Sequence, residues 1–297
     1  MNILIDTDIG CDCDDAGAFA VLHALLPKTE SRLLAVTCSS PGEAPPRLAE
    51  SINRFYGVDV PVGCMTAELE SFTDVYAARL TENESRTGYP TAVSVMRRAL
   101  SVAPEHSVVF IGIGGQSNMA GLMRSPPDDI DILGGAELLK SRLAYTVVMG
   151  GRFADDTPEW NIVSDIAAAR VVAEEWPGEI IYCGHEVGEN VMTGGVFFSP
   201  EGELLLPEHP VAQAYYIHSG GLPRYSWDPV TVLAAMMPDT CGLVMSKSGI
   251  VEIDDNGAAL FREVKGTRRY IYPPENPRWL ENEINRLMLY NTKFFRR

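Results

Sequence analysis

Short apolar runs alternate with amphipathic segments along the first two thirds of the chain. A first apolar run covers residues 2–5, and four more of the continuous kind that forms strands buried on both faces cover residues 32–38, 107–113, 143–149 and 179–183. Segments with apolar residues at helical spacing lie between them, at residues 16–26, 46–56, 91–102 and 164–175. This alternation predicts an α/β fold with a doubly wound, mostly parallel sheet.

The pattern changes after residue 190. Helices are expected over residues 211–219, 229–237 and 277–289, and a hairpin is expected to turn at Asn256-Gly257. The sequence has no internal repeat, low-complexity segment or linker. We therefore expect a single domain over residues 1–297, with helical insertions over one edge of the sheet.

The overall charge excludes several classes of partner. A formal net charge of −16 opposes binding to nucleic-acid polymers and to anionic membrane surfaces, which depends on clustered Lys and Arg. We interpret Arg268-Arg269 and the terminal Lys293, Arg296 and Arg297 as solvated surface. The first residues hold no basic leader and no bilayer-length apolar run, so a cytoplasmic location is expected. The six cysteines have no framework spacing and are expected to be reduced.

An acidic loop follows the first predicted strand. It carries five carboxylates within ten residues, Asp6, Asp8, Asp12, Asp14 and Asp15, and no Lys or Arg lies between Met1 and Pro27 to offset them. Ligands of open parallel sheets bind beyond the carboxyl ends of the strands, which is where this loop falls. Because the loop offers only oxygen ligands, a bound metal ion is expected to be a hard cation. Ca²⁺ suits an irregular shell of carboxylates, carbonyls and hydroxyls. The alternative is an acidic loop that caps the helix at Ala16.

Five short motifs carry a resemblance to a known family. Asp6-Thr7-Asp8-Ile9-Gly10 followed by Asp14-Asp15-Ala16 resembles the amino-terminal signature of the inosine-uridine nucleoside hydrolases. Four further segments are similar to later motifs of that family, in the same order and near the same spacing: 110–118 (FIGIGGQSN), Met149-Gly150-Gly151, Glu159-Trp160-Asn161 and Trp227-Asp228-Pro229. The resemblance covers residues 4 to about 236.

The resemblance implies a nucleoside hydrolase-like fold, a small-molecule nucleoside or other ribose-containing substrate, and a homodimer or homotetramer. It implies Ca²⁺ bound by Asp8, Asp15, Asp228 and the main-chain carbonyl of Ile113, with Asp8 as the general base that activates water. The residues that it assigns to the substrate are Asp14, Asn118, Met149, Glu159, Asn161 and Trp227.

Two departures from the family pattern bear on mechanism. Cys11-Asp12-Cys13 lengthens the acidic loop, which leaves open whether Asp8 or Asp12 faces the water. Trp227 stands where pyrimidine-accepting members have a histidine that protonates the leaving base. A tryptophan stacks on a purine instead, which favours purine ribonucleosides. Of the five histidines, we rank His218 first as a substitute acid.

Other interpretations of the same residues compete with this one. Taken singly, the glycines of 112–115 fit a tight turn, Glu159 a helix cap, Trp160 a core residue, and Asp228 an N-cap before Pro229. A haloacid-dehalogenase-like phosphatase also places Asp-x-Asp after its first strand, but it leaves Asp14-Asp15 unexplained. A non-catalytic calcium and ribose-ligand binding protein on the same fold is the alternative from a different class.

Overall fold

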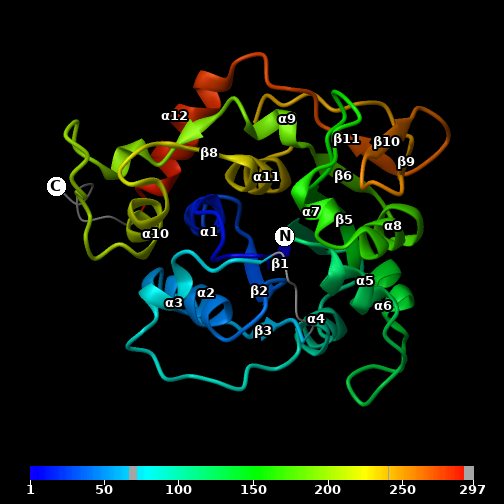
Figure 1. Cartoon of the computed structure of the whole chain (residues 1–297). Coiled ribbons are helices and arrows are strands. Elements are labelled where there is room, and N and C mark those ends of the chain that lie inside the picture. The colour runs from blue at the N-terminus through cyan, green and yellow to red at the C-terminus, as the bar shows by residue number, and fades with distance from the viewer. Residues whose placement is uncertain (67–71, 240, 291–297) are drawn as a thin grey trace.

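A seven-stranded parallel sheet runs through the middle of the protein (Figure 1). The computed structural model describes residues 1–66, 72–239 and 241–290. The strand order across the sheet is β11-β6-β5-β4-β1-β2-β3, and every neighbouring pair is parallel. The strands are β1 (Asn2–Thr7), β2 (Arg32–Cys38), β3 (Val62–Cys64), β4 (Val108–Ile113), β5 (Leu143–Met149), β6 (Ile180–Cys183) and β11 (Arg268–Tyr270). The predicted fold class is confirmed.

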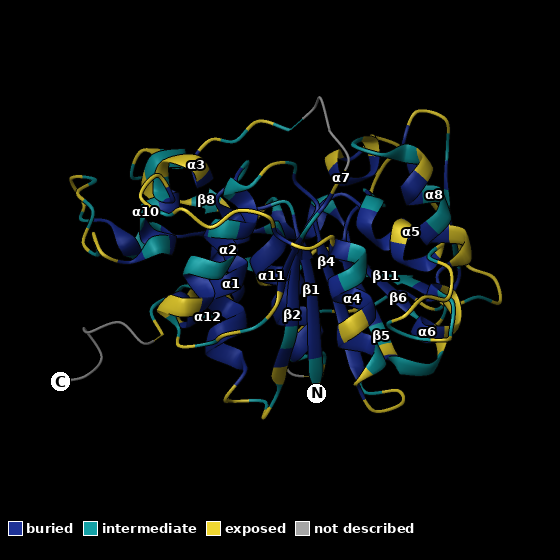
Figure 2. Ribbon diagram, turned by 90° about the horizontal axis from the view of Figure 1, so that it is seen from below, coloured by how far each residue is buried: buried dark blue, intermediate teal, exposed yellow. Residues whose placement is uncertain are grey.

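Helices cover both faces of the sheet, as Figures 1 and 2 show. One face packs against α1 (Asp14–Leu25), α2 (Ala44–Phe55), α10 (Pro210–Ser219), α11 (Trp227–Met236) and α12 (Pro277–Met288). The other face packs against α4 (Ala92–Ser101), α5 (Ser117–Met123), α6 (Gly135–Arg142) and α8 (Ile166–Glu175). The buried side chains form one apolar core on each side. Strands covered on both faces explain the continuous apolar runs.

Short elements complete the fold. They are α3 (Ala77–Leu80), α7 (Trp160–Val163), α9 (His185–Gly188), the 3₁₀ turn Gly195–Phe197, and two antiparallel pairs, β7 (Met192–Thr193) with β8 (Arg224–Tyr225) and β9 (Ile250–Ile253) with β10 (Ala259–Arg262). The predicted hairpin at Asn256-Gly257 is confirmed, with Gly257 at a φ of 89° that glycine adopts readily. Among the described helices, none combines the length and apolar character needed to cross a bilayer.

The structure rules out one competing interpretation and corrects one expectation. Helix α11 begins at Trp227 with Ser226 as its N-cap, so Asp228 lies in the first turn and its side chain does not cap the helix. Arg268 is not solvated surface: it lies in edge strand β11 and is 4% exposed, and its guanidinium donates to the carbonyls of Ala173, Gly178 and Trp176. Lys293, Arg296 and Arg297 lie outside the described residues.

Candidate active site

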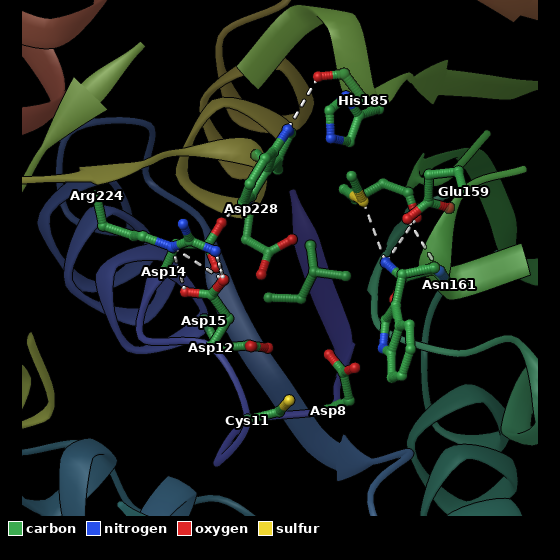
Figure 3. Close-up of a pocket in the computed structure, with 14 residues that line it drawn as sticks. Asp8, Cys11, Asp12, Asp14, Asp15, Glu159, Asn161, His185, Arg224 and Asp228 are labelled. Carbon is green, nitrogen blue, oxygen red and sulfur yellow. Dashed lines mark hydrogen bonds and ion pairs between the residues drawn. The ribbon is translucent and has the colours of Figure 1, made fainter. Parts of the chain in front are cut away.

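A cavity of about 360 Å³ opens at the carboxyl ends of β1, β4 and β5. Its lining includes most of the side chains singled out by the sequence, and Figure 3 shows them around one space. The lining residues are Asp8, Cys11, Asp12, Asp14, Asp15, Ile113, Met149, Glu159, Trp160, Asn161, His185, Arg224, Trp227 and Asp228. The acidic loop and the Trp227-Asp228 corner, over 200 residues apart in sequence, therefore meet in one pocket.

One wall of the pocket is a cluster of three buried carboxylates, Asp14, Asp15 and Asp228. One oxygen from each lies within 4.8 Å of the others. The cluster forms because α1 and α11 pack side by side and both begin at the pocket. The main-chain N–H of Asp228 donates to Oδ2 of Asp14 at 3.1 Å, and the hydroxyl of Thr7 donates to Asp15.

The electrostatics of this cluster fit a bound cation. Burial raises the pKa of Asp14, Asp15 and Asp228 well above the ordinary value, and the negative charges of neighbouring aspartates raise it further. The N-cap of α1 is Cys13, which makes no side-chain capping bond, and Asp14 and Asp15 lie in the first turn of the helix. Buried carboxylates need a compensating positive charge. The arrangement can hold a metal ion.

Asp6 and Asp8 face different ways. Asp6 is buried behind the pocket, where its Oδ1 accepts hydrogen bonds from the Thr37 hydroxyl at 2.5 Å and from the Asn118 amide at 2.9 Å. Asp8 lines the pocket, and its negative charge raises the pKa of Asp15. Burial raises the pKa of Asp8 to about 7, and the charges of nearby carboxylates add to the effect.

The turn after β4 fixes the backbone at Asp8. A Cβ atom at Gly114 would lie 2.6 Å from the amide nitrogen of Asp8 and 2.5 Å from the hydroxyl of Ser39. Only glycine allows this approach, which explains the glycine-rich segment that follows Ile113. Ile113 itself lines the pocket.

The lengthened acidic loop is held by Arg224. Its guanidinium binds the carboxylate of Asp12 through Nε, 3.1 Å from each oxygen, and through Nη2. The imidazole of His218 lies 3.6 Å from the same carboxylate. Asp12, Cys13 and His218 form a second group with metal-ligand spacing, but Arg224 already supplies a positive charge to its only carboxylate. Asp12 is therefore occupied by an ion pair.

The opposite wall carries Glu159 and Asn161 (Figure 3). Glu159 caps α7: its carboxylate accepts the main-chain N–H groups of Gly151, Asn161 and Ile162. Burial raises the pKa of Glu159 to about 7, and these hydrogen bonds oppose the rise. The amide of Asn161 donates to the carbonyl of Met149 at 3.3 Å. The wall is thus a rigid set of polar groups at the end of β5.

The third side of the pocket is aromatic. The indole N–H of Trp227 donates to the carbonyl of His185 at 2.9 Å, and the two rings lie 5.1 Å apart. The guanidinium of Arg224 lies 5.2 Å from the Trp227 ring. Trp160 lines the pocket and is 49% exposed, so the interpretation of this residue as part of the core is wrong.

Sequence reasoning missed three residues that line the pocket, Cys11, Arg224 and His185. His185 could have been found, because it follows β6 as directly as the acidic loop follows β1. Arg224 carries no such signal, since its role depends on the partner that the fold brings to it. Asn118, expected at the substrate, lies behind the lining and donates to Asp6 and to the carbonyl of Cys38.

Comparison with known proteins agrees with the geometry. The family model "inosine-uridine preferring nucleoside hydrolase" matches residues 3–269, which is most of the chain. The chain belongs to this family. Nucleoside hydrolases cleave the N-glycosidic bond of small-molecule nucleosides, so the chain is an N-glycosyl hydrolase of ribonucleosides. The resemblance seen in the five motifs is confirmed, and the haloacid-dehalogenase alternative falls away.

Solved structures share the nucleoside hydrolase fold with this chain. A plant nucleoside hydrolase, PpNRh1, has a TM-score of 0.72 and 19% identity, with 97% of both chains covered. A purine-preferring ribonucleoside hydrolase from Gardnerella vaginalis has a TM-score of 0.69 and 16% identity, covering 97% of this chain and 98% of that one. The type III effector protein XopQ, complexed with adenosine diphosphate ribose, has a TM-score of 0.67 and 16% identity, covering 97% and 93%. None of the curated proteins matches the sequence.

Proposed function

We propose that the chain is a calcium-dependent hydrolase that prefers purine ribonucleosides and releases free base and ribose. The observation that carries this proposal is the buried cluster of Asp14, Asp15 and Asp228 facing Glu159 and Asn161 across one cavity. The first group suits a hard cation and a sugar diol, and the second suits the remaining polar groups of a ribose.

The ion would be held by Asp8, Asp15, Asp228 and the main-chain carbonyl of Ile113. All of these ligands are oxygens, and an irregular set with two buried carboxylates suits Ca²⁺ better than the strict octahedron of Mg²⁺. When bound, the ion supplies the positive charge that acidifies a water molecule and orients the ribose hydroxyls. The positive charge of the ion also offsets the mutual repulsion of these carboxylates, which burial screens poorly.

Asp8 would accept the proton from the attacking water. Asp12 is the alternative base, but its carboxylate is engaged by Arg224 and lies beside His218. Asp8 lines the cavity and has no comparable ion pair among the described residues.

The sugar would be bound from both walls. Asp14 would accept a ribose hydroxyl on the acidic side, with Glu159, Asn161 and the Met149 carbonyl on the other. Each carboxylate oxygen of Glu159 accepts main-chain hydrogen bonds, and a carboxylate has room for further donors. Asn118 would act indirectly, by holding Asp6 and the end of β1. The dense negative charge would also stabilise the oxocarbenium-like transition state.

The preference for purines would come from Trp227. Its indole N–H is committed to the carbonyl of His185, so what it offers to a base is aromatic surface. A larger bicyclic base gains more from such contact than a pyrimidine does. The Gardnerella vaginalis enzyme of the same fold is itself described as purine-preferring.

The proposal is tested by release of free ribose from inosine, guanosine, adenosine and uridine, in added Ca²⁺ and in chelator. We expect turnover of the three purine ribonucleosides that is lost on chelation and restored by Ca²⁺, with slower turnover of uridine. Equal rates for uridine and inosine would refute the purine preference, and activity that survives chelation would refute the metal dependence. Ribose binding without turnover of any substrate would favour the ribose-ligand binding protein, a role consistent with the XopQ complex with adenosine diphosphate ribose.

Three further features stay predictions from the sequence. They are a homodimer or homotetramer, a cytoplasmic location, and a single nucleoside hydrolase-like domain over residues 1–297. Sedimentation of the purified protein tests the first.

A further inference from the structure

The side of the pocket left for the base has no obvious proton donor. Trp227 stands immediately before Asp228, and its N–H already donates to a main-chain carbonyl. A purine is a poor leaving group as an anion, so cleavage of its N-glycosidic bond is faster when a nitrogen of the base is protonated. The pocket therefore needs an acid from another element.

His185 occupies a suitable place. It is the first residue of α9, directly after β6, and it lines the cavity beside Trp227. Figure 3 shows its imidazole directed from the helix toward the space between Asp228 and Glu159. The side chain is 30% exposed, so it is accessible to a ligand in the pocket while most of its surface is covered.

The contacts of the ring leave one nitrogen for a substrate. Nδ1 lies 3.2 Å from a carboxylate oxygen of Glu189 and 3.3 Å from Nη1 of Arg152. Among the described residues, none makes a hydrogen bond or ion pair with Nε2 of His185. The main chain is fixed as well, because the N–H of His185 donates to the carbonyl of Gly151 and its carbonyl accepts from Trp227. The ring is therefore oriented by its neighbours, with Nε2 available.

The other candidate acids of the pocket are less suitable. His218 contacts Asp12 but is not among the residues that line the cavity. Burial raises the pKa of the Cys11 thiol to about 11, which makes it a weak acid at neutral pH. Glu159 already accepts three main-chain hydrogen bonds. His185 is the pocket histidine that carries an unused nitrogen.

We propose that His185 protonates the departing base, and that Glu189 is a positioning residue that orients its imidazole. This inference rests on the proposed hydrolysis of ribonucleosides. The oxygen of water bonds to C1′ of the ribose and its proton passes to Asp8. The bond from C1′ to the base nitrogen breaks, its electron pair stays on the base, and the proton on Nε2 of His185 passes to the base. Solvent then returns the proton from Asp8 to His185, so the net reaction is nucleoside plus water to ribose plus base.

The surroundings of His185 predict a pH dependence. Burial lowers its pKa, Glu189 opposes this, Arg152 lowers it further, and Asp155 raises it. A general acid must be protonated, so turnover that depends on it falls as the pH rises through the pKa of the group. The fall is expected only for substrates whose leaving group needs a proton.

The experiment compares two substrates, inosine and p-nitrophenyl β-D-ribofuranoside, whose p-nitrophenolate departs without protonation. His185→Asn keeps a polar atom near Nδ1 and removes Nε2, while His185→Gln keeps a neutral donor that cannot titrate. We expect kcat for inosine to fall by about 10²–10³ in both variants, while kcat for the p-nitrophenyl riboside stays within about threefold. Glu189→Gln should move the fall of inosine turnover to lower pH. The matched control is His106→Asn, an exposed histidine before β4 at the opposite end of the sheet, with a φ of 50° that asparagine tolerates.

Each result separates this inference from the function on which it rests. Turnover of the p-nitrophenyl riboside by the His185 variants shows that the site is folded, so selective loss of inosine turnover supports the acid role. An equal fall for both substrates, or unchanged inosine turnover, would overturn that role while leaving the hydrolase intact. A wild-type protein that cleaves neither substrate in Ca²⁺ would overturn the proposed function itself.

Discussion

The acidic cluster predicts that replacing Asp228 by asparagine has opposite effects on stability with and without calcium. In chelator, Asp14, Asp15 and Asp228 repel one another, because their oxygens lie within 4.8 Å in a buried site. Asp228→Asn would keep the shape of the side chain and the main-chain N–H that donates to Asp14. The substitution removes a charge that has no ion-pair partner among the described residues, so the metal-free variant should be more stable than the wild type.

The magnitude follows from the geometry. Two full charges at this distance repel by about 3.5 kcal/mol at an effective dielectric constant of about 20. The raised pKa values of the cluster mean that partial protonation already relieves some of this repulsion, which leaves a gain of about 2 kcal/mol. At about 2 °C per kcal/mol, the Tm of the variant in chelator should be about 4 °C higher.

Calcium should reverse the order. An ion present at about 1,000 times its Kd stabilises the native state by about 4 kcal/mol, or about 8 °C, and the variant should lose most of this gain. The assay is thermal unfolding followed by circular dichroism at pH 7.5, in chelator and over a calcium titration. The control for loss of one charge is Asp129→Asn, at an exposed aspartate between α5 and α6. Its Tm in chelator and its Tm in calcium should both stay within about 1 °C of the wild-type values. A variant less stable than the wild type in chelator, or with the full calcium response, would refute the reasoning.

Three further predictions concern single residues. Asp8→Asn should lower kcat for inosine by about 10²–10⁴, whereas Asp12→Asn should lower it by less than about tenfold; the reverse order in steady-state assays would make Asp12 the base. His23 is buried against Tyr56 and burial lowers its pKa to about 4, so the unfolded state binds its proton first as the pH falls below 6.5. Between pH 7 and 4.5, the free energy of unfolding measured in urea should therefore fall by about 2.5 kcal/mol more for the wild type than for His23→Gln. Equal falls for the two proteins would contradict this. Both Trp227→Phe and Trp227→Ala should raise KM for inosine, and the rise should be severalfold smaller for Trp227→Phe because phenylalanine keeps an aromatic face. Equal KM values for the two variants in the same assay would argue against stacking.

The sheet could be predicted from the sequence because most of its strands are buried on both faces. β2 and β5 have the expected bounds, and β4 and β6 begin one residue later than expected. β11 was missed because its sequence, Arg268–Tyr270, has no apolar run. Arg268 reaches this position by donating hydrogen bonds to carbonyls of the loop and helix beside it, which a hydropathy pattern does not record.

The site could be predicted where its residues follow the strands. The acidic loop, Ile113, Met149 and Glu159 lie at or after strand ends, and the structure brings them to one pocket. The pairing of Asp12 with Arg224 could not be foreseen, because it joins residues 212 positions apart. The orientation of Asp6 is a similar case: alternation along β1 places Asp6 and Asp8 on the same face, but the chain leaves the strand after Thr7 and only Asp8 reaches the cavity.

The acidic cluster combines residues from two distant parts of the chain, and this affects when the cluster can form during synthesis. Asp14 and Asp15 precede Asp228 by more than 200 positions, so they leave the ribosome well before it. The cluster is complete only when α11 has docked on α1, so a chain in which these helices are apart lacks the full set of ligands. Retention of an ion at this site therefore reports that the two distant parts of the polypeptide have assembled correctly, and a chain truncated before residue 228 should be unable to acquire it.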